Sequence, residues 1–345
     1  FRQDFEAYKA GKYDYLILDE AQVMKNTQTK IAKYLRDFSV PHCLALSGTP
    51  IENHLLEIWS IFQIILPGLL PAKKAFLKLT PKEVARYISP FILRRKKEEV
   101  LPDLPDLIEV THQSELSDDQ KAIYLAQLQQ MQQGLILASD QEINRRKVEI
   151  LSGITRLRQI CDTPALFMDY AGDSGKIDSL RDLLSQIKES DHRVLIFSQF
   201  RGMLDITEGL LEELGISSYK LTGSTPSDSR QEMTRAFNQG SRDAFLISLK
   251  AGGVGLNLTG ADTVILIDLW WNPAVEMQAI SRAHRIGQEQ NVEVYRLITR
   301  GTIEEKILEL QEGKKNLVTT VLDGNESRAS MTIEDIKEIL GIAIS

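Results

Sequence analysis

Residues 275–288 carry the side chains whose spacing is best suited to chemistry. Gln278, Arg282 and Arg285 are three or four positions apart, so they share one face if this segment is helical. Two guanidinium groups that point the same way repel each other unless a negative group lies in front of them. A triphosphate meets this condition, because arginine stabilises the charge that develops on a transferred phosphoryl group. The alternative is a solvated helix face with ordinary salt bridges.

A helix over residues 273–286 is expected to position these groups. Asn272 is a favoured N-cap, Pro273 suits the first helical turn, and Gly287 suits the end of the helix. The sequence therefore predicts a helix that begins at Pro273 and presents both arginines along one side.

Two carboxylates, Asp19 and Glu20, follow the apolar run Tyr15–Leu18. A buried strand that ends in acidic residues is typical of ligand sites at the carboxyl edge of a parallel sheet. In a nucleotide site Asp19 would hold Mg²⁺ through water, and Glu20 would orient or deprotonate the attacking water. The alternative is an acidic pair with only a structural role at the end of a strand.

Three further segments have compositions that suit contact with phosphate or nucleic acid. Ser47–Pro50 reads Ser-Gly-Thr-Pro after the apolar run Cys43–Leu46, so its backbone can pass close to a phosphate. Residues 248–257 include closely spaced glycines, which allow the same close approach. Trp270 and Trp271 can brace the core or touch a nucleic-acid backbone. For each segment a plain turn or ordinary core packing is the alternative.

Apolar runs that alternate with helical periodicity predict an α/β fold with parallel sheets. The expected strands are Tyr15–Leu18, Cys43–Leu46, Val194–Ser198, Ser218–Leu221, Ala244–Ser248, Thr263–Asp268 and Val292–Ile298. The expected helices lie near residues 27–38, 52–65, 202–214, 227–239, 273–286 and 332–340. These elements place each segment that carries candidate site residues at the end of a strand or beside one.

The composition changes at residues 93–114, where basic, acidic and proline residues alternate. This predicts an extended connection between two domains. Ser117 then begins a Ser-x-x-Gln capping box and a glutamine-rich helix that runs to about Ala138. A second helix is expected near 141–161. The two helices predict an insertion that is not part of a sheet.

The overall composition is that of an ordinary globular protein, with 43% hydrophobic and 26% charged residues among 345. No apolar run approaches the roughly 20 residues of a membrane span. The net charge of −7 does not indicate nucleic-acid binding, and basic clusters near residues 94–97 and 145–158 are, taken alone, ordinary surface. Cys43 and Cys161 are isolated, which favours a reducing compartment. The five histidines lack metal-ligand spacing, so no zinc site is predicted.

Eight short motifs occur in order along the chain. They are Asp-Glu-Ala-Gln (19–22), Ser-Gly-Thr-Pro (47–50), Phe-Ile-Leu-Arg-Arg-Lys (91–96), Val-Leu-Ile-Phe-Ser-Gln-Phe (194–200), Leu-Thr-Gly-Ser (221–224), Lys-Ala-Gly-Gly-Val-Gly-Leu-Asn-Leu (250–258), Trp-Trp-Asn-Pro (270–273) and Arg-Ala-His-Arg-Ile-Gly-Gln (282–288). Together they resemble the Swi/Snf family of DNA-dependent ATPases, within helicase superfamily two. The resemblance runs from about residue 14 to about 310. Gln22, where many relatives carry histidine, resembles bacterial or archaeal members.

The resemblance implies RecA-like parallel sheets, a partial first lobe and a complete second lobe, with helical insertions. ATP and Mg²⁺ would lie between the lobes and double-stranded DNA across the cleft. The implied domains are residues 1–92 as the C-terminal part of lobe 1, 93–116 as the inter-lobe linker, 117–170 as a helical protrusion, 171–301 as lobe 2, and 302–345 as a C-terminal brace helix and tail.

Roles for single residues also follow from the resemblance. Asp19, Glu20, Arg282 and Arg285 match catalytic positions; Gln22, Ser47, Thr49, Gly253, Gly255 and Gln278 match positions that bind nucleotide or couple to it; and Asn53, Thr222, Gly223, Lys250 and Trp271 match positions near DNA. The implied protein is a monomeric motor that acts on a DNA-bound protein or polymerase complex and not on a membrane. Its expected place is the cytoplasm, with the nucleoid, or the nucleus if the source is eukaryotic.

One required motif is not in the sequence. The family cradles phosphates with G-x-x-x-x-G-K-[ST], and the nearest string, Gly172–Ile177, has the wrong glycine spacing and follows no strand. By comparison with the family, this loop is expected upstream of Phe1. Two other hypotheses stay open: a non-catalytic DNA-binding or regulatory module, and a helicase that separates strands.

Overall fold

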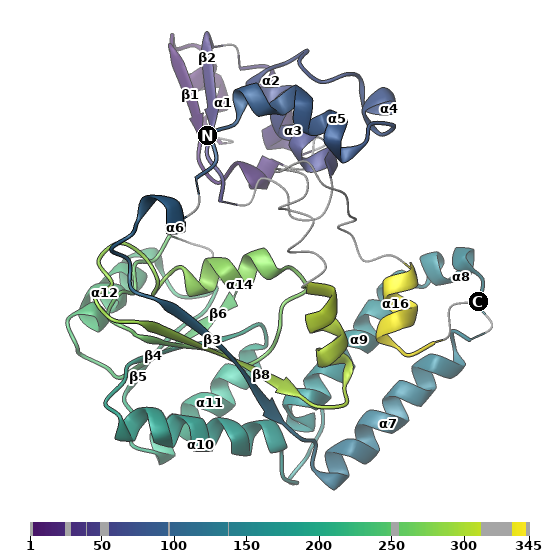
Figure 1. The fold of residues 1–345 in the computed structure, drawn as a ribbon, viewed down its shortest axis with the longest axis vertical. Helices are drawn as coiled ribbons and strands as arrows, with labels where there is room; N and C mark the ends of the chain where they lie inside the picture. The colour runs from purple at the N-terminus through teal and green to yellow at the C-terminus, as the bar shows by residue number, and fades with distance from the viewer. Residues whose placement is uncertain are drawn as a thin grey trace. The chain divides into compact units, whose positions relative to one another are not determined.

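A computed structural model of the protein describes residues 3–24, 29–38, 40–48, 55–95, 97–136, 138–249, 255–311 and 333–342 (Figure 1). The described residues divide into two compact units, one up to Arg94 and the other from Arg95 onward.

The first unit contains a small parallel sheet. Strand β1 (Tyr15–Leu18) pairs with β2 (His42–Ala45). The helical elements are α1 (Phe5–Lys9), η1 (Ala21–Met24), α2 (Lys30–Arg36), α3 (Leu55–Ile65), α4 (Lys73–Phe76), α5 (Pro81–Ile88) and η2 (Ser89–Phe91). Side chains of α2 and α3 pack on one face of the sheet, around Leu18, Leu35 and Ile61. The strand predicted over Tyr15–Leu18 is confirmed, and β2 begins one residue earlier than predicted.

The other face of this sheet is exposed and apolar. Tyr15, Ile17, Leu44 and Leu46 alternate with the packed side chains, and each is more than half exposed, from 51% to 59%. Parallel sheets normally bury both faces, and an isolated two-stranded pair is only marginally stable. The sheet of the first unit is therefore a weak element of the chain.

The second unit contains a six-stranded, all-parallel sheet. Its strands are β3 (Leu107–Ser114), β4 (Val194–Ser198), β5 (Ser218–Leu221), β6 (Ala244–Ser248), β7 (Thr263–Leu266) and β8 (Val292–Thr299). They lie in the order β3-β8-β7-β4-β6-β5. The five strands predicted for this part of the chain are confirmed to within two residues at each end.

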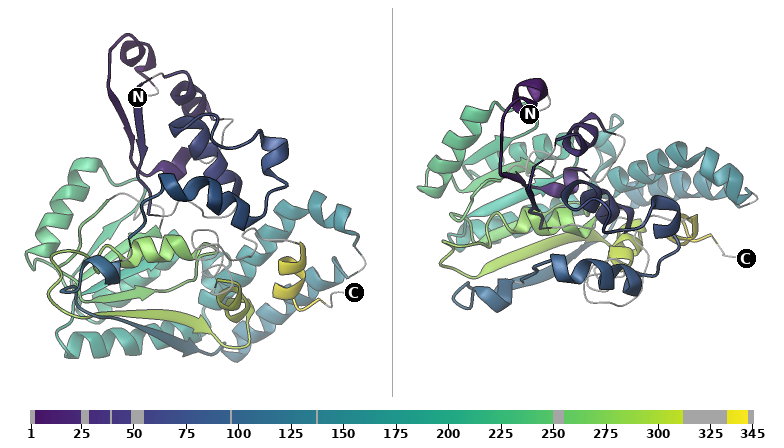
Figure 2. Two further views of the ribbon diagram at one scale, coloured as in Figure 1. Left: turned by 45° about the horizontal axis from the view of Figure 1, so that its top comes forward. Right: turned by 90° about the horizontal axis from the view of Figure 1, so that it is seen from above.

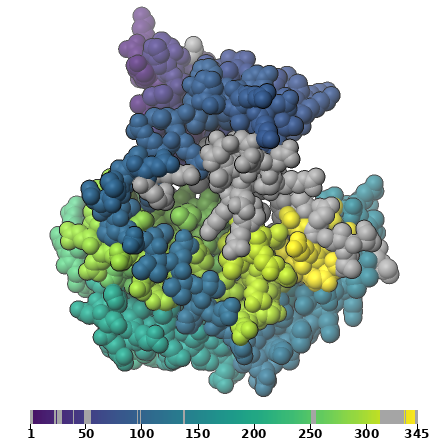
Figure 3. All heavy atoms as spheres, in the orientation of Figure 1, coloured from purple at the N-terminus to yellow at the C-terminus, as the bar shows by residue number. Residues whose placement is uncertain are grey.

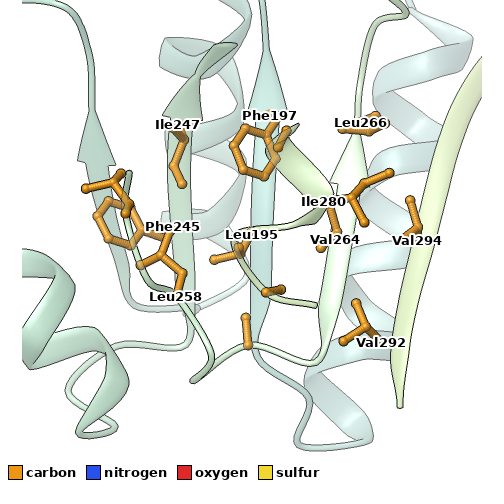
Figure 4. Packing of buried hydrophobic residues seen from close by; sticks show 14 of the residues in the cluster. Leu195, Phe197, Phe245, Ile247, Leu258, Val264, Leu266, Ile280, Val292 and Val294 are labelled. Carbon is orange, nitrogen blue, oxygen red and sulfur yellow. The ribbon is translucent and has the colours of Figure 1, made fainter. Parts of the chain in front are cut away.

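Helices cover both faces of the sheet, as Figure 2 shows. One core contains Phe197, Phe245 and Val264 with Ile280, where α12 (Ser227–Asn238) and α14 (Pro273–Ile280) pack (Figure 4). The opposite core lies under α10 (Gly175–Glu189) and α11 (Arg201–Glu213). Successive side chains of each strand point to opposite faces, so central strands are buried on both sides and appear in the sequence as continuous apolar runs.

The segment predicted as an extended linker, 93–116, contains structure. It includes α6 (Lys97–Val100) and β3, which pairs along its whole length with β8. The expectation of a wholly extended connection is therefore wrong. As an edge strand, β3 has neighbours on one side only, and Ile108 and Val110 are 42% and 37% exposed; Figure 3 shows its surface on this side of the unit. Because apolar and polar residues mix in it, the segment lacks a continuous apolar run.

The predicted helical insertion is present. It comprises α7 (Asp118–Gln133), α8 (Asp140–Arg145), α9 (Lys147–Asp162) and η3 (Pro164–Leu166), and Ser117 forms the predicted capping box. Residues 303–311 are helical, and α16 (Ile333–Ile339) follows further along the chain. A third core joins these helices through Ile154, Ile303 and Ile336.

We expect amide exchange to reflect the difference between the two sheets. In the 345-residue chain, the backbone amides of β1 and β2 should exchange about tenfold faster or more than those of β4 and β6, because among the described residues the side chains on one face of the small sheet are more than half exposed. Hydrogen–deuterium exchange read by mass spectrometry measures this. Equal or slower exchange in β1 and β2 would contradict the expectation.

Candidate nucleotide and DNA site

The two predicted catalytic carboxylates, Asp19 and Glu20, lie at the carboxyl end of β1. Asp19 and Glu20 are both exposed, and the Glu20 N–H donates to Asp19 Oδ1 at 2.9 Å. A 2.9 Å hydrogen bond from Ala21 N to Leu46 O joins this turn to the end of β2. The structure therefore brings the acidic pair and the segment that begins at Ser47 to one edge of the small sheet.

The backbone at the acidic pair is strained. Glu20 has a φ of +49°, in the left-handed region that costs a residue with a Cβ about 1–2 kcal/mol, and strain of this kind clusters at functional sites. Among the described residues no group of three or more His, Cys, Asp or Glu could hold a metal. Mg²⁺ commonly uses one or two protein carboxylates together with water and substrate phosphates, and Asp19 with Glu20 fits that smaller role.

Several predicted site residues lie outside the part of the chain that the structure describes. They are Thr49, Asn53, Lys250, Gly253 and the side chain of Gln22. Gly255 is described and exposed, and a Cβ at this position would meet no atom within 4 Å. Among the described residues, no neighbour requires glycine at position 255.

The helix that carries the arginine motif is shorter than predicted. α14 ends at Ile280, although it begins as expected: the Asn272 side chain accepts from Ala274 N at 3.1 Å, and proline occupies the first turn. Residues 281–287, which we name the arginine turn, form turns instead of helix. The predicted helix over 273–286 is therefore wrong in its second half.

A hydrogen bond from outside the helix fixes the turn that follows its end. Leu258 N donates to the Arg282 carbonyl at 2.9 Å, an acceptor that a continuing helix would use internally. Arg282 N already bonds three residues back, to Ala279 O at 3.1 Å. The spacing predicted that Gln278, Arg282 and Arg285 share one helical face. This prediction is wrong, because only Gln278 lies in the helix.

The two arginines nevertheless lie together in one turn of the second unit. The Arg282 side chain is buried, with 8% of the residue exposed. Arg285 is half-buried, and its Nη1 donates to Leu256 O at 3.2 Å. Gln278 is half-buried on α14. The turn thus contains one buried arginine and one half-buried arginine.

The segment that leads from α6 into β3 also contacts the arginine turn. Lys97 Nζ donates to the His284 carbonyl at 2.7 Å, and His284 Nε2 lies 2.8 Å from Pro105 O. His284 is the residue between the two arginines in the motif, so the turn is held from this side as well.

The residues predicted to contact DNA follow strand ends of the second unit. Thr222 and Gly223 come directly after β5; Thr222 Oγ1 lies 2.9 Å from Ser224 Oγ, and Gly223 O accepts from Arg230 Nη2 at 3.2 Å. Trp271 follows β7 and is half-buried. All three lie beyond carboxyl ends of parallel strands, where such folds bind ligands.

Trp271 rests on Arg158, which belongs to the basic cluster near residues 145–158 that was expected to be ordinary surface; for Arg158 this expectation is wrong, because the residue is buried. Arg158 of α9 is 1% exposed, and its guanidinium lies 5.4 Å from the Trp271 ring centroid. It donates to Gln199 Oε1 at 3.0 Å and to Leu269 O, and Asp268 lies 3.8 Å away. Burial raises the pKa of Asp268, and the charge of Arg158 opposes that rise. The partners are 41 or more residues from Arg158, so no local pattern indicates the contact.

The string Gly175-Lys176, which resembles a phosphate loop only in part, is a packing element. Lys176 is fully buried; its Nζ donates to Asp162 at 2.8 Å, to Glu304 at 2.6 Å and to Ile267 O at 3.2 Å. Burial acts to lower the pKa of Lys176, but Asp162 and Glu304 outweigh it and raise that pKa. A Cβ at Gly175 would lie 1.8 Å from the Glu115 carbonyl oxygen. The lysine therefore joins α9, α10 and the 303–311 helix, and it does not contact phosphate.

A buried carboxylate fixes the start of α14. Glu276, 2% exposed, accepts from Trp270 N at 2.7 Å, Gln311 Nε2 at 2.6 Å and Arg296 Nε at 3.3 Å. Burial raises the pKa of Glu276, and these three partners reduce the rise. The helix before the arginine turn is thereby tied to β8 and to the 303–311 helix.

Comparison with known domain families agrees with these features. Residues 2–166 match the SNF2-related domain, and residues 175–287 match the helicase conserved C-terminal domain. Among solved structures, the SWI2/SNF2 ATPase core of Sulfolobus solfataricus in complex with dsDNA is 32% identical, with a TM-score of 0.55 over 98% of this chain and 75% of that one. The C-terminal part of the Fun30 ATPase domain is 26% identical, with a TM-score of 0.53 over 65% of this chain and 100% of that chain.

Curated relatives come from eukaryotes and bacteria alike. The chain is 34% identical to TATA-binding protein-associated factor MOT1 of Saccharomyces cerevisiae over 99% of its own length and 22% of MOT1. It is 37% identical to YwqA of Bacillus subtilis over 99% of its length and 39% of YwqA. The chain thus spans well under half the length of each of these two relatives. Because one relative is eukaryotic and the other bacterial, the similarity does not support the prediction of a bacterial or archaeal source.

The parallel sheets with flanking helices match the RecA-like architecture of the solved SWI2/SNF2 core, which confirms the predicted fold class. No helix among the described residues is long and apolar enough to cross a membrane. Three observations support one family assignment. They are the two domain matches, the order of the motifs, and the 32% identity across three quarters of a solved core. The chain belongs to the SWI2/SNF2 family.

Proposed function

We propose that the whole protein, meaning the complete product of its gene, is an ATP-dependent translocase on double-stranded DNA. The observation that carries the proposal is the arginine turn. Arg282 and Arg285 belong to one turn of a unit with a RecA-like parallel sheet, and the Arg282 carbonyl and the Arg285 guanidinium both bond to residues 256–258, in a chain that belongs to the SWI2/SNF2 family. Hydrolysis would drive movement along DNA that displaces or remodels bound proteins.

The first-unit residues would act on the nucleotide. Mg²⁺, bound with ATP, would neutralise charge on the phosphates. Asp19 would hold it through water, and Glu20 would orient or deprotonate the attacking water. Both carboxylates are exposed at a strand end, which leaves them accessible to a nucleotide. Gln22, Ser47 and Thr49 would bind the nucleotide or couple to it.

The second unit would supply the remaining groups. Arg282 and Arg285 would stabilise the charge on the transferred phosphoryl group, and Gly253, Gly255 and Gln278 would bind the nucleotide or couple to it. The DNA contacts would come from Asn53 of the first part of the chain and from Thr222, Gly223, Lys250 and Trp271. We expect these contacts to reach the phosphate backbone, because nothing in the sequence reads bases.

The names of relatives support the DNA substrate and a protein target. The similar Sulfolobus core was solved with dsDNA, and MOT1 is named for its association with the TATA-binding protein. A DNA-bound protein or polymerase complex is therefore the proposed target. The protein would work as a monomeric motor, on the bacterial nucleoid or in the nucleus according to its source.

The proposed domains are lobe 1 over 1–92, a connecting segment over 93–116, a protrusion over 117–170, lobe 2 over 171–301 and a brace helix with tail over 302–345. The connecting segment also supplies β3, the edge strand of the second unit's sheet. The described division of the chain after Arg94 supports the first boundary. The helices of α7 to α9 support the third segment, and the helix over 303–311 supports the last.

We expect the 345-residue chain alone to show no DNA-stimulated ATP turnover, because its sequence contains no G-x-x-x-x-G-K-[ST] loop to cradle the phosphates. A coupled phosphate-release assay with and without duplex DNA measures this. The whole protein is the matched sample, and it should turn over ATP faster when DNA is added. Clear turnover by the 345-residue chain would contradict the expectation.

A non-catalytic DNA-binding or regulatory module is the second candidate function. Sequencing the gene upstream of the codon for Phe1 distinguishes the two: a G-x-x-x-x-G-K-[ST] motif there supports the translocase, and a gene without one supports the module.

A further inference from the structure

Gln288, the last residue of the arginine motif, has a buried amide with an unusual set of partners. Its residue is 8% exposed. Its Nε2 donates to the carbonyl oxygens of Ala261 at 2.7 Å, Thr259 at 3.3 Å and Ala283 at 3.3 Å. Ala283 lies within the arginine turn, whereas the other two acceptors belong to the loop before β7. One side chain therefore joins the arginine turn to that loop.

The other half of the amide is also used. Gln288 Oε1 accepts from Glu289 N and Gln290 N, both at 2.9 Å. Gly287, just before it, has a φ of +97°, so the chain reverses sharply here before entering β8. A side chain at this position must donate to carbonyls and accept from amides at once, and only a carboxamide of this length does both.

The loop before β7 is itself held at several points. Asn238 of α12 donates from Nδ2 to Asn257 O at 2.8 Å and accepts from Gly260 N at 3.1 Å. Residues 256–261 also bond twice to the arginine turn, at the Arg282 carbonyl and the Arg285 guanidinium. We name the assembly of residues 256–261, the arginine turn and Gln288 the clasp.

We propose that Gln288 is a positioning residue for Arg282 and Arg285. It does not touch the nucleotide. Through the clasp it fixes the backbone between the two arginines to the loop 256–261, so that the guanidinium groups keep one position relative to the sheet. The inference rests on the proposed function, since it assigns the arginines their role in phosphoryl transfer.

The first test is Gln288→Met in the whole protein. Methionine has a similar length but neither donates nor accepts as an amide does. We expect kcat for DNA-stimulated ATP turnover to fall about tenfold to a hundredfold, the scale of a small misplacement of a catalytic group, while KM for ATP changes less than about threefold. Gln239→Met, an exposed glutamine at the end of α12, is the matched control and should keep wild-type kcat.

A second variant removes the donor while keeping the acceptor. Gln288→Glu keeps an oxygen for the Glu289 and Gln290 amides but loses the Nε2 donor to the three carbonyls. It should lower kcat in the same manner. An unchanged kcat in both variants, beside an active wild type, overturns the proposal.

A structural readout separates this inference from the proposed function. In the 345-residue chain, Gln288→Met should speed amide exchange at Leu258, Glu289 and Gln290 while β4 and β6 keep wild-type rates. If the wild-type whole protein shows no DNA-stimulated turnover, the proposed function fails, and the exchange result still tests the clasp. Unchanged exchange at these three amides overturns the inference.

Discussion

Arg285→Ala in the whole protein is expected to lower kcat for DNA-stimulated ATP turnover by about three orders of magnitude, the scale of an arginine that stabilises the transition state of phosphoryl transfer. Arg285 is the half-buried arginine of the turn, and its guanidinium is anchored by Leu256 O at 3.2 Å. A group that acts mainly in the transition state changes kcat more than KM. Steady-state kinetics at saturating DNA measure both constants.

The matched control is Arg235→Ala, which removes an exposed arginine from α12 of the same unit. It should leave kcat within about threefold of the wild type. Arg285→Lys keeps the charge but not the planar fork of donors, and it should recover only part of the lost rate. Wild-type kcat in Arg285→Ala would remove the arginine turn from the mechanism.

Lys176→Met is expected to destabilise the second unit by about 3–5 kcal/mol, the cost of leaving buried charges without their partner. Lys176 is fully buried and bonds to both Asp162 and Glu304, so its loss leaves two carboxylates in the core. Native-state exchange of β4 and β7 amides in urea measures the free energy of unfolding of this unit.

Two further variants separate the ionic contribution from packing. Lys188→Met, on the same helix, removes an exposed lysine bonded to a carbonyl oxygen and should cost about 1 kcal/mol. Adding Asp162→Asn and Glu304→Gln to Lys176→Met removes the uncompensated charges, so part of the lost stability should return. A loss below about 1 kcal/mol in Lys176→Met would contradict the interpretation.

The sequence predicts strands well where both faces are buried. All five positions of Val194–Ser198 are buried, and the first four form an unbroken apolar run, so the predicted bounds agree with the structure. β3 was missed because polar residues interrupt its apolar ones, and Ile108 and Val110 remain partly exposed. An edge position alone does not hide a strand, since β5 lies at the opposite edge and its bounds agree with the prediction.

In the candidate site, features that depend on neighbouring residues could be predicted, and features that depend on residues far away in the sequence could not. The N-cap of Asn272 and the capping box of Ser117 depend on residues within one turn, and both predictions are confirmed. The end of α14 depends on Leu258, 24 residues before the acceptor Arg282 by sequence number, so the periodicity overestimated the helix. Arg158 and Lys176 have their partners far away in sequence, and no spacing rule would find them.

The most direct test of the proposed function is triplex displacement by the whole protein. A labelled third strand is bound to duplex DNA, and its release is followed with and without ATP. A translocase on duplex DNA should release the third strand only with ATP and should leave a forked duplex unseparated. The Glu20→Gln variant should release no third strand, with or without ATP. Separation of the forked duplex without triplex release would support a strand-separating helicase, and no ATP-dependent release of either kind would contradict the proposed motor.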